Sequence, residues 1–179
     1  MSWIVVDVEA DGPCPGIYSM ISFGAVLLTP KLDQTFYGQV LPVTEEFEPE
    51  ALKVVGITRE EHKKPPYRNP VNVMLEFSDW LSDVSGGYRP VFVSDNPAFD
   101  WQWINYYFHF YLGDGNPMGH SARRIGDLYC GFVKDSRKNH QWKKRLRKTK
   151  HTHNPIDDAM GNAEALLAMR DMGLYIPIE

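Results

Sequence analysis

Apolar residues in the first part of the chain occur in short runs whose length and spacing predict β-strands. Residues 3–8, 22–28 and 34–41 each form such a run, and the segments between them contain Gly or Pro. Runs of four to eight apolar and β-branched residues are typical of strands buried in a sheet. Because the connections are short, we expect the three strands to pair as an antiparallel meander.

The pattern changes to a helical period after residue 68. Apolar side chains recur every three or four positions from Asn69-Pro70, a capping residue followed by a favoured first helical residue, to Gly86-Gly87. A fourth strand is predicted at 91–93, and further helices are predicted at 100–111, 122–133 and 155–172. This order predicts an α/β fold with a mixed sheet, in which the antiparallel meander is extended by parallel strands and helices pack on the sheet.

Length and composition are those of an ordinary globular protein. The chain has 179 residues, of which 43% are hydrophobic, so residues 1–179 fit a single domain with a core of normal size. Asp7 interrupts the first apolar run, which is therefore too short for a membrane span or a secretory signal. Cys14 and Cys130 are far apart in the sequence and lack the spacing of metal ligands. We expect a cytoplasmic protein without membrane contact.

Positive charge is concentrated towards the C-terminus, although the net charge is −4. Residues 134–150, called the basic segment below, contain nine Lys or Arg and one acidic residue. Such a segment either contacts a polyanion or forms a solvated loop, and its position directly before His153 leaves both interpretations open. If it contacts a nucleic acid, Lys143, Lys144 and Arg145 are expected to guide the phosphate backbone.

Two acidic residues, Asp7 and Glu9, lie at the end of the first predicted strand. Alternate side chains of a strand share a face, so both carboxylates project to one side at the strand end where open α/β sheets usually place their sites. Converging carboxylates repel one another unless a cation is present, and oxygen ligands of this kind suit Mg²⁺ or Mn²⁺. Taken alone, such a pair is more often a solvated strand end.

Three further candidates come from two distant segments. Asp100 follows the fourth predicted strand, where it could also serve as the cap of the next helix. Asp158 lies in the first turn of the last predicted helix, a position that favours an acid for structural reasons alone. His153 is the candidate proton acceptor. From the residues alone, Asp157 competes with Asp158 and His151 competes with His153.

Read together, the order D-x-E, N-x-x-x-D and H-x-x-x-x-D-A resembles the DEDDh family of 3′→5′ exonucleases, which have a ribonuclease-H-like fold. The resemblance extends over nearly the whole chain and includes residues 21–26 (ISFGAV), 50–58 (EALKVVGIT) and 127–128 (DL). The family's five-residue interval between histidine and acid favours His153 and Asp158 over their neighbours.

The resemblance also implies roles for individual residues. It makes four carboxylates the ligands of two Mg²⁺ or Mn²⁺ ions, with His153 as the general base: Asp7, Glu9, Asp100 and Asp158. It places the 3′-terminal nucleotide against four further residues: Ala10, Gly56, Ile57 and Asn96.

At three positions the chain departs from the family pattern. Val55 and Asp95 stand where relatives often carry His, and Pro155 stands where they usually carry Ala. These departures concern contacts with the substrate and leave the catalytic set complete.

The resemblance implies a metal-dependent 3′→5′ exonuclease that releases nucleoside 5′-monophosphates from single-stranded 3′ ends, with RNA slightly favoured over DNA. Two alternatives are a non-catalytic nucleic-acid-binding or polymerase-associated module on the same fold and a ribonuclease-H-like endonuclease. The intact acids argue against the first, because such charges are costly without a metal. His153 ahead of Asp158 argues against the second.

The helix predicted after Asp100 is rich in aromatic residues. One stripe along it is expected to enter the core: Trp101, Ile104, Phe108 and Tyr111. A second stripe lies on another side of the helix: Trp103, Tyr107 and Phe110. For the second stripe we expect a separate packing surface or a homodimer interface, with base stacking as the alternative.

Overall fold

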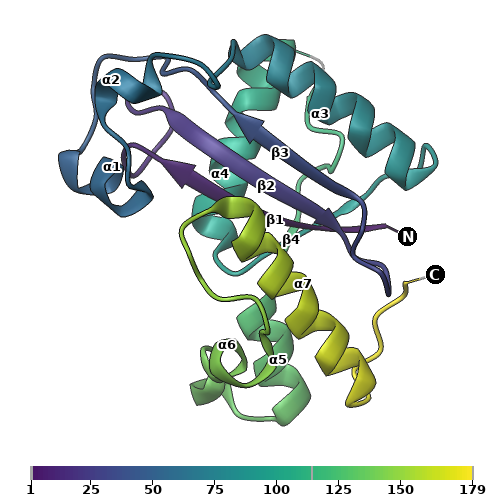
Figure 1. The fold of residues 1–179 in the computed structure, drawn as a ribbon. Helices are drawn as coiled ribbons and strands as arrows, with labels where there is room; N and C mark the ends of the chain where they lie inside the picture. Colours follow the sequence, from purple (N-terminus) through teal and green to yellow (C-terminus); the bar gives the residue numbers. More distant parts are fainter. Residues whose placement is uncertain (1, 114, 179) are drawn as a thin grey trace.

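The computed structural model describes residues 2–113 and 115–178, which form a five-stranded mixed sheet between two layers of helices (Figure 1). The strand order is β3-β2-β1-β4-β5. β1 and β2, and β2 and β3, are antiparallel, whereas β4 and β5 run parallel to β1. The strands are β1 (Trp3–Ala10), β2 (Met20–Leu27), β3 (Thr35–Gln39), β4 (Val91–Ser94) and β5 (Ala122–Arg124). The predicted meander extended by parallel strands is therefore confirmed.

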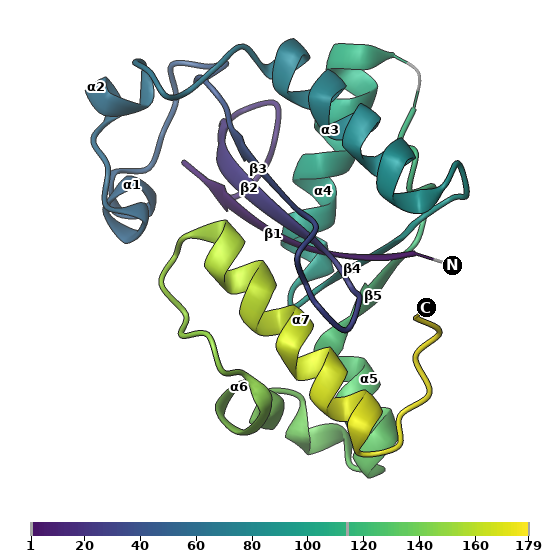
Figure 2. The ribbon, with the colours of Figure 1, turned by 45° about the vertical axis from the view of Figure 1, so that its right-hand side comes forward.

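The helices divide between the two faces and one end of the sheet. Figure 2 shows α7 along one side of the sheet, α3 and α4 on the opposite side, and α1 and α2 near the C-terminal end of β1. Their bounds are α1 (Pro49–Val55), α2 (Arg59–His62), α3 (Pro70–Ser85), α4 (Pro97–Tyr107), α5 (Ile125–Val133), α6 (Gln141–Leu146) and α7 (Pro155–Asp171). A π-helical turn (Phe108–Leu112) continues α4, and a short 3₁₀ turn (Ser136–Lys138) follows α5.

The alternation of side chains along β1 separates two cores. Ile4, Val6 and Val8 face the core formed with α3 and α4. Trp3 and Val5 face the second core, formed with α5, α6 and α7. Because successive side chains of a strand point to opposite faces, the odd-numbered residues at the end of β1 continue on the α7 side.

Local signals account for the ends of the two longest helices. The Asn69 side chain caps α3 by accepting a hydrogen bond from the N–H of Val71 at 2.9 Å, and α3 ends at Gly86 with φ 59°. Asn154 caps α7 in the same way through the N–H of Ile156 at 3.2 Å. Within the described residues, no helix is long and apolar enough to cross a membrane.

Several predicted boundaries differ from the observed ones. The helix predicted at 100–111 begins three residues earlier, at Pro97, so Asn96 rather than Asp100 occupies its N-cap. The segment predicted as a helix at 122–133 is split, because residues 122–124 pair with β4 as an edge strand before α5 begins. The basic segment contains α6, whose Trp142 is fully buried, so it is not simply a solvated loop.

The prediction of a second packing surface on α4 is wrong for two of its three residues. Trp103 and Tyr107 are fully buried in the α3–α4 core. The hydroxyl of Tyr107 also accepts a hydrogen bond from the backbone N–H of Met20 at 2.9 Å, which ties α4 to β2. Phe110 alone is exposed, at 64%. Because Trp103 and Tyr107 are enclosed in the core, the structure does not support the homodimer interface expected on this stripe.

Candidate active site

The end of β1 carries the first two candidate ligands. Asp7 and Glu9 face the α7 layer, while Val8 between them faces the α3–α4 core. β4 pairs with β1 only over residues 3–5, so β1 extends beyond its parallel neighbour. Asp100, in the first turn of α4, binds this extension, because its Oδ1 accepts a hydrogen bond from the N–H of Val8 at 3.1 Å.

A close backbone approach brings α7 to the same place. Gly24 of β2 pairs with Asp7, and a Cβ atom at Gly24 would lie only 2.4 Å from the carbonyl oxygen of Pro155. Only glycine lets the start of α7 lie this close to the sheet. Asp158, in the first turn of α7, is therefore buried directly over the end of β1.

These elements bring three carboxylates together. One oxygen atom each from Asp7, Glu9 and Asp158 lies within 4.8 Å of the other two. Asp100 reaches the same part of β1 through its hydrogen bond to Val8. Burial raises the pKa of Asp7 well above its usual range, and the charges of Asp100, Asp158 and Glu9 raise it further. Arg147 opposes this shift in the pKa of Asp7.

The same two causes act on the neighbouring carboxylates. Burial, and then the charges of Asp158 and Asp100, raise the pKa of Glu9 to about 8. Burial raises the pKa of Asp100 to about 7, although its hydrogen bonds, including the one from Val8, oppose the shift. Without a cation these groups hold protons near neutral pH. A divalent cation would remove this cost, and a set of converging carboxylate oxygens fits Mg²⁺ or Mn²⁺.

Two histidines lie beside the carboxylates. The backbone N–H of His153 donates to Oδ2 of Asp158 at 3.0 Å, and its Nδ1 lies 3.6 Å from Oε1 of Glu9. The Nδ1 of His151 lies 2.7 Å from Oδ1 of Asp158, and the two imidazole rings are in edge-to-face contact. Both histidines are partly open to solvent, at 43% for His153 and 56% for His151. Geometry therefore brings both to the site.

The structure distinguishes the rival acids more clearly. Asp158 lies with Asp7 and Glu9, whereas Asp157 accepts a hydrogen bond from the hydroxyl of Thr152 at 3.0 Å at the start of α7. Asp158 is thus the member of this pair that can share a cation with β1.

Asp95, one of the departures from the family pattern, has a structural partner. Its carboxylate forms an ion pair with Lys143 of α6. Its backbone carbonyl also accepts a hydrogen bond from Nε of Arg124 at 3.2 Å. Asp95 therefore ties the basic segment to the end of β4, next to Asn96.

The candidate contacts for a 3′-terminal nucleotide lie around the end of β1. Ala10 ends the strand, and Asn96 begins α4 without using its side chain as a cap. Gly56 ends α1 with φ 80°, and Ile57 follows it. Gly56 and Ile57 line an open hollow of about 460 Å³ together with Phe47, Pro49, Leu52, Lys53, Thr58 and Arg59.

Sequence reasoning missed a buried polar cluster that holds the hollow in place. Nη1 of Arg59 lies 2.6 Å from Oδ2 of Asp11, just after the end of β1, and both side chains are buried. His62 is also buried, and its Nε2–H donates a hydrogen bond to the carbonyl oxygen of Val40 at 2.8 Å; burial lowers the pKa of His62 to about 4. Asp11 follows Glu9 by two residues, as Glu9 follows Asp7. This spacing was the signal in the sequence that could have placed Asp11 near the site.

Known structures share this fold. The nuclease domain of 3′hExo, a DEDDh family member bound to rAMP, superimposes with a TM-score of 0.78 at 18% identity, covering 99% of this chain and 96% of that chain. E. coli Exonuclease I in complex with a dT13 oligonucleotide gives a TM-score of 0.67 at 15% identity, covering 97% of this chain and 41% of that chain. No family model matches the sequence.

The sequence itself decides the family. The chain is 42% identical over 131 residues to the 3′–5′ DNA exonuclease Cap18 of Escherichia coli, which covers 72% of this chain and 68% of the relative. The chain belongs to the DEDDh family of 3′–5′ exonucleases. The predicted family, fold and enzyme class are thereby confirmed. The slight preference for RNA has no support, because the relative at 42% identity is a DNA exonuclease.

Proposed function

We propose that residues 1–179 act as one exonuclease domain, which removes nucleoside 5′-monophosphates from the 3′ ends of single-stranded DNA in the presence of Mg²⁺ or Mn²⁺. The observation that carries the proposal is the meeting of Asp7, Glu9 and Asp158 within 4.8 Å, with His153 beside Glu9. The 42% identity to a 3′–5′ DNA exonuclease supports DNA as the substrate.

Four carboxylates would hold the metal ions: Asp7, Glu9, Asp100 and Asp158. Two divalent cations bound there would polarise the scissile phosphate and stabilise the negative charge that develops on it and on the leaving 3′-oxygen. The raised pKa values of Asp7 and Glu9 support this assignment, because carboxylates with so little compensating charge are suited to a cation.

His153 is the proposed general base. Its Nδ1 is directed towards Oε1 of Glu9 at 3.6 Å, which leaves Nε2 to accept a proton from the attacking water. His151 is the rival, since its Nδ1 lies 2.7 Å from Asp158. Separate alanine substitutions distinguish them: His153→Ala should lower kcat by a factor of roughly 10² to 10⁴. If His151→Ala shows the larger loss, the assignment of the base passes to His151.

The 3′-terminal nucleotide is proposed to lie against Ala10 and Asn96 on one side and against Gly56 and Ile57 on the other. Ala10 ends β1, and the helices that Gly56 and Asn96 flank, α1 and α4, both contact β1. The exposed backbone of Gly56 and the open hollow beside Ile57 leave room for a sugar and a base.

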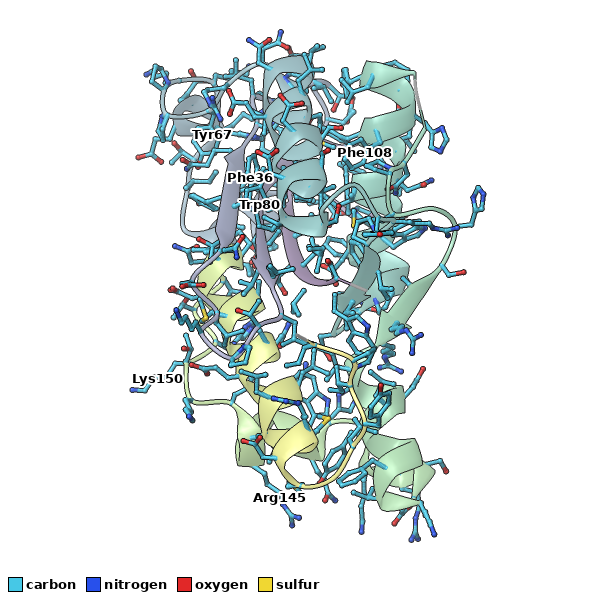
Figure 3. All side chains as sticks on the ribbon, turned by 90° about the vertical axis from the view of Figure 1, so that its right-hand side faces the viewer. Phe36, Tyr67, Trp80, Phe108, Arg145 and Lys150 are labelled. Atoms are coloured by element: carbon cyan, nitrogen blue, oxygen red, sulfur yellow. The ribbon has the colours of Figure 1, made fainter. Side chains whose placement is uncertain are left out.

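The basic segment is proposed to guide the single strand towards this site. Figure 3 shows Arg145 and Lys150 extending into solvent from the part of the molecule that carries α6 and α7. Lys144 and Arg145 are exposed, whereas Lys143 is already paired with Asp95 and would contribute less. Lys and Arg that neutralise phosphates make binding salt-dependent.

A charge-reversal experiment tests this guidance. Lys144→Glu combined with Arg145→Glu should raise KM and flatten the dependence of KM on salt, and adding Lys143→Glu should have a smaller further effect. Arg170→Glu, at the exposed far end of α7, is the matched control and should leave both unchanged. An unchanged salt dependence in the double variant would show that the segment does not contact the substrate.

Matched substrates test the choice of strand and the direction of attack. Single-stranded DNA and RNA of one sequence, each labelled at the 5′ end, should be shortened stepwise from the 3′ end, with DNA degraded faster. A circular single strand should resist. Cleavage of the circle would indicate a ribonuclease-H-like endonuclease, and faster degradation of RNA would refute the substrate assignment.

A further inference from the structure

Arg147, which directly follows α6, is buried against α7 beside one of the proposed metal ligands. Its side chain is 9% exposed, and its Nη2 lies 2.8 Å from Oδ1 of Asp158, whose side chain is 1% exposed. Its Nη1 donates to Oδ1 of Asn162 at 3.4 Å, one turn further along α7. The guanidinium therefore contacts two residues, one turn apart, on the same face of α7. The compact ammonium of a lysine cannot make both contacts in the same way.

The helix leaves room for this side chain. A Cβ atom at Gly161 would lie 2.5 Å from Nε and 2.6 Å from Nη2 of Arg147, so only glycine permits the observed contact. Nε of Arg147 is buried and has no hydrogen-bond partner among the described residues. A buried donor without a partner costs about 1–3 kcal/mol. A local conflict of this kind is typical of functional sites.

The chain after Arg147 continues along the same helix towards the histidines. Glu164 of α7 accepts hydrogen bonds from the backbone N–H groups of Lys148 and Thr149 at 2.9 and 2.7 Å. The segment then returns to Asp158 through His151 and His153. Arg147 is thus the first of three contacts that this segment makes with Asp158, and it is the most deeply buried of them.

We propose that Arg147 is a positioning residue that fixes the carboxylate of Asp158 for metal binding and anchors the segment carrying His151 and His153 to α7. The inference rests on the proposed function of the same site. A purely electrostatic role would give the opposite result for the metal, because removing a positive charge beside the ligands would tighten the binding of a cation. Partners that orient metal ligands typically change metal affinity or activity by a factor of 10 to 100.

The test uses two kinds of variant, each with a matched control. Both Arg147→Met and Arg147→Lys remove the contact with two residues of α7; the Met variant also removes the positive charge, whereas the Lys variant keeps it. Arg170→Met is the control at an exposed arginine. Gly161→Ala displaces the guanidinium while favouring the helix, and Gly131→Ala, a helical position with no neighbour within 4 Å, is the glycine control. For each protein, the rise in Tm with added Mn²⁺ gives the metal affinity, and digestion of single-stranded DNA gives kcat and KM.

Arg147→Met, Arg147→Lys and Gly161→Ala should all weaken Mn²⁺ binding about 10- to 100-fold and lower kcat by a similar factor, with KM changed much less. The alanine favours the helix, so the metal-free Tm of Gly161→Ala should fall less than that of Arg147→Met; weak Mn²⁺ binding by this folded variant separates positioning from a failure to fold. Mn²⁺ binding that is unchanged or tighter in these variants, or full recovery by Arg147→Lys, would overturn the inference. If the wild type itself neither binds Mn²⁺ nor digests DNA, the proposed function falls first.

Discussion

The metal-free protein should lose stability as the pH rises, and Glu9→Gln should remove a large part of that loss. The pKa of Glu9 is about 8 in the fold, against a usual value of 4.5, so the folded protein holds this proton more tightly than the unfolded chain does. The contribution of this proton to the free energy of unfolding is therefore fully present below the pKa of Glu9 in the unfolded chain, and it is lost as the pH rises through the pKa of Glu9 in the fold. At about 1.4 kcal/mol per pH unit, roughly 3 kcal/mol of the loss falls between pH 5.5 and 8.5.

Thermal melts in the presence of a chelator measure this effect. For a protein of this size, 1 kcal/mol corresponds to about 2–4 °C in Tm, so the wild type should lose roughly 6–12 °C more than Glu9→Gln between the two pH values. Glu60→Gln, on the exposed side of α2, is the control and should behave like the wild type. Mg²⁺ should reduce the fall in the wild type and have little effect in Glu9→Gln. Equal pH dependence in the two proteins would show that the proton on Glu9 does not contribute to the stability of the fold.

Three substitutions test how the fold supports the site. Tyr107→Phe leaves the buried N–H of Met20 without its partner and should lower stability by about 1–3 kcal/mol, measured by urea unfolding. Gly24→Ala should push the start of α7 away from the sheet, because a Cβ would meet the carbonyl of Pro155, and should lower kcat more than it raises KM. Trp142→Ala should destabilise the protein by about 3–5 kcal/mol, a loss that a solvated loop would not show in a thermal melt.

The sequence predicted those parts of the fold that depend on local patterns. β1, β2 and α3 follow from apolar runs, helical spacing and the caps at Asn69 and Gly86, all of which act between neighbours in the chain. β5 could not be predicted in this way, because its residues 122–124 form a strand only through pairing with β4. Trp103 and Tyr107 lie in the core, on a face that the helical period had assigned elsewhere, because they pack in one cluster with side chains of β1, β2 and α3.

The candidate site was likewise predicted from the sequence only in part. Asp7 and Glu9 share a face through strand alternation, which the sequence shows directly. The family's interval between histidine and acid favoured Asp158 over Asp157, and the structure adds the physical reason, because Asp157 bonds to Thr152 while Asp158 lies with the other carboxylates. Arg147 was one of nine basic residues in a single run, and only the packing of that run on α7 distinguishes it from the others.

The proposed role of the carboxylates at the end of β1 is to support metal-dependent removal of nucleotides from a 3′ end. The most direct test is digestion of 5′-labelled single-stranded DNA with Mg²⁺ by the wild type and by Asp7→Asn, with the small products identified by mass. We predict stepwise shortening from the 3′ end with release of nucleoside 5′-monophosphates by the wild type, and loss of this activity in Asp7→Asn or in EDTA. Internal cleavage, or wild-type rates in Asp7→Asn or in EDTA, would show that these carboxylates do not act as a metal-dependent 3′ exonuclease site.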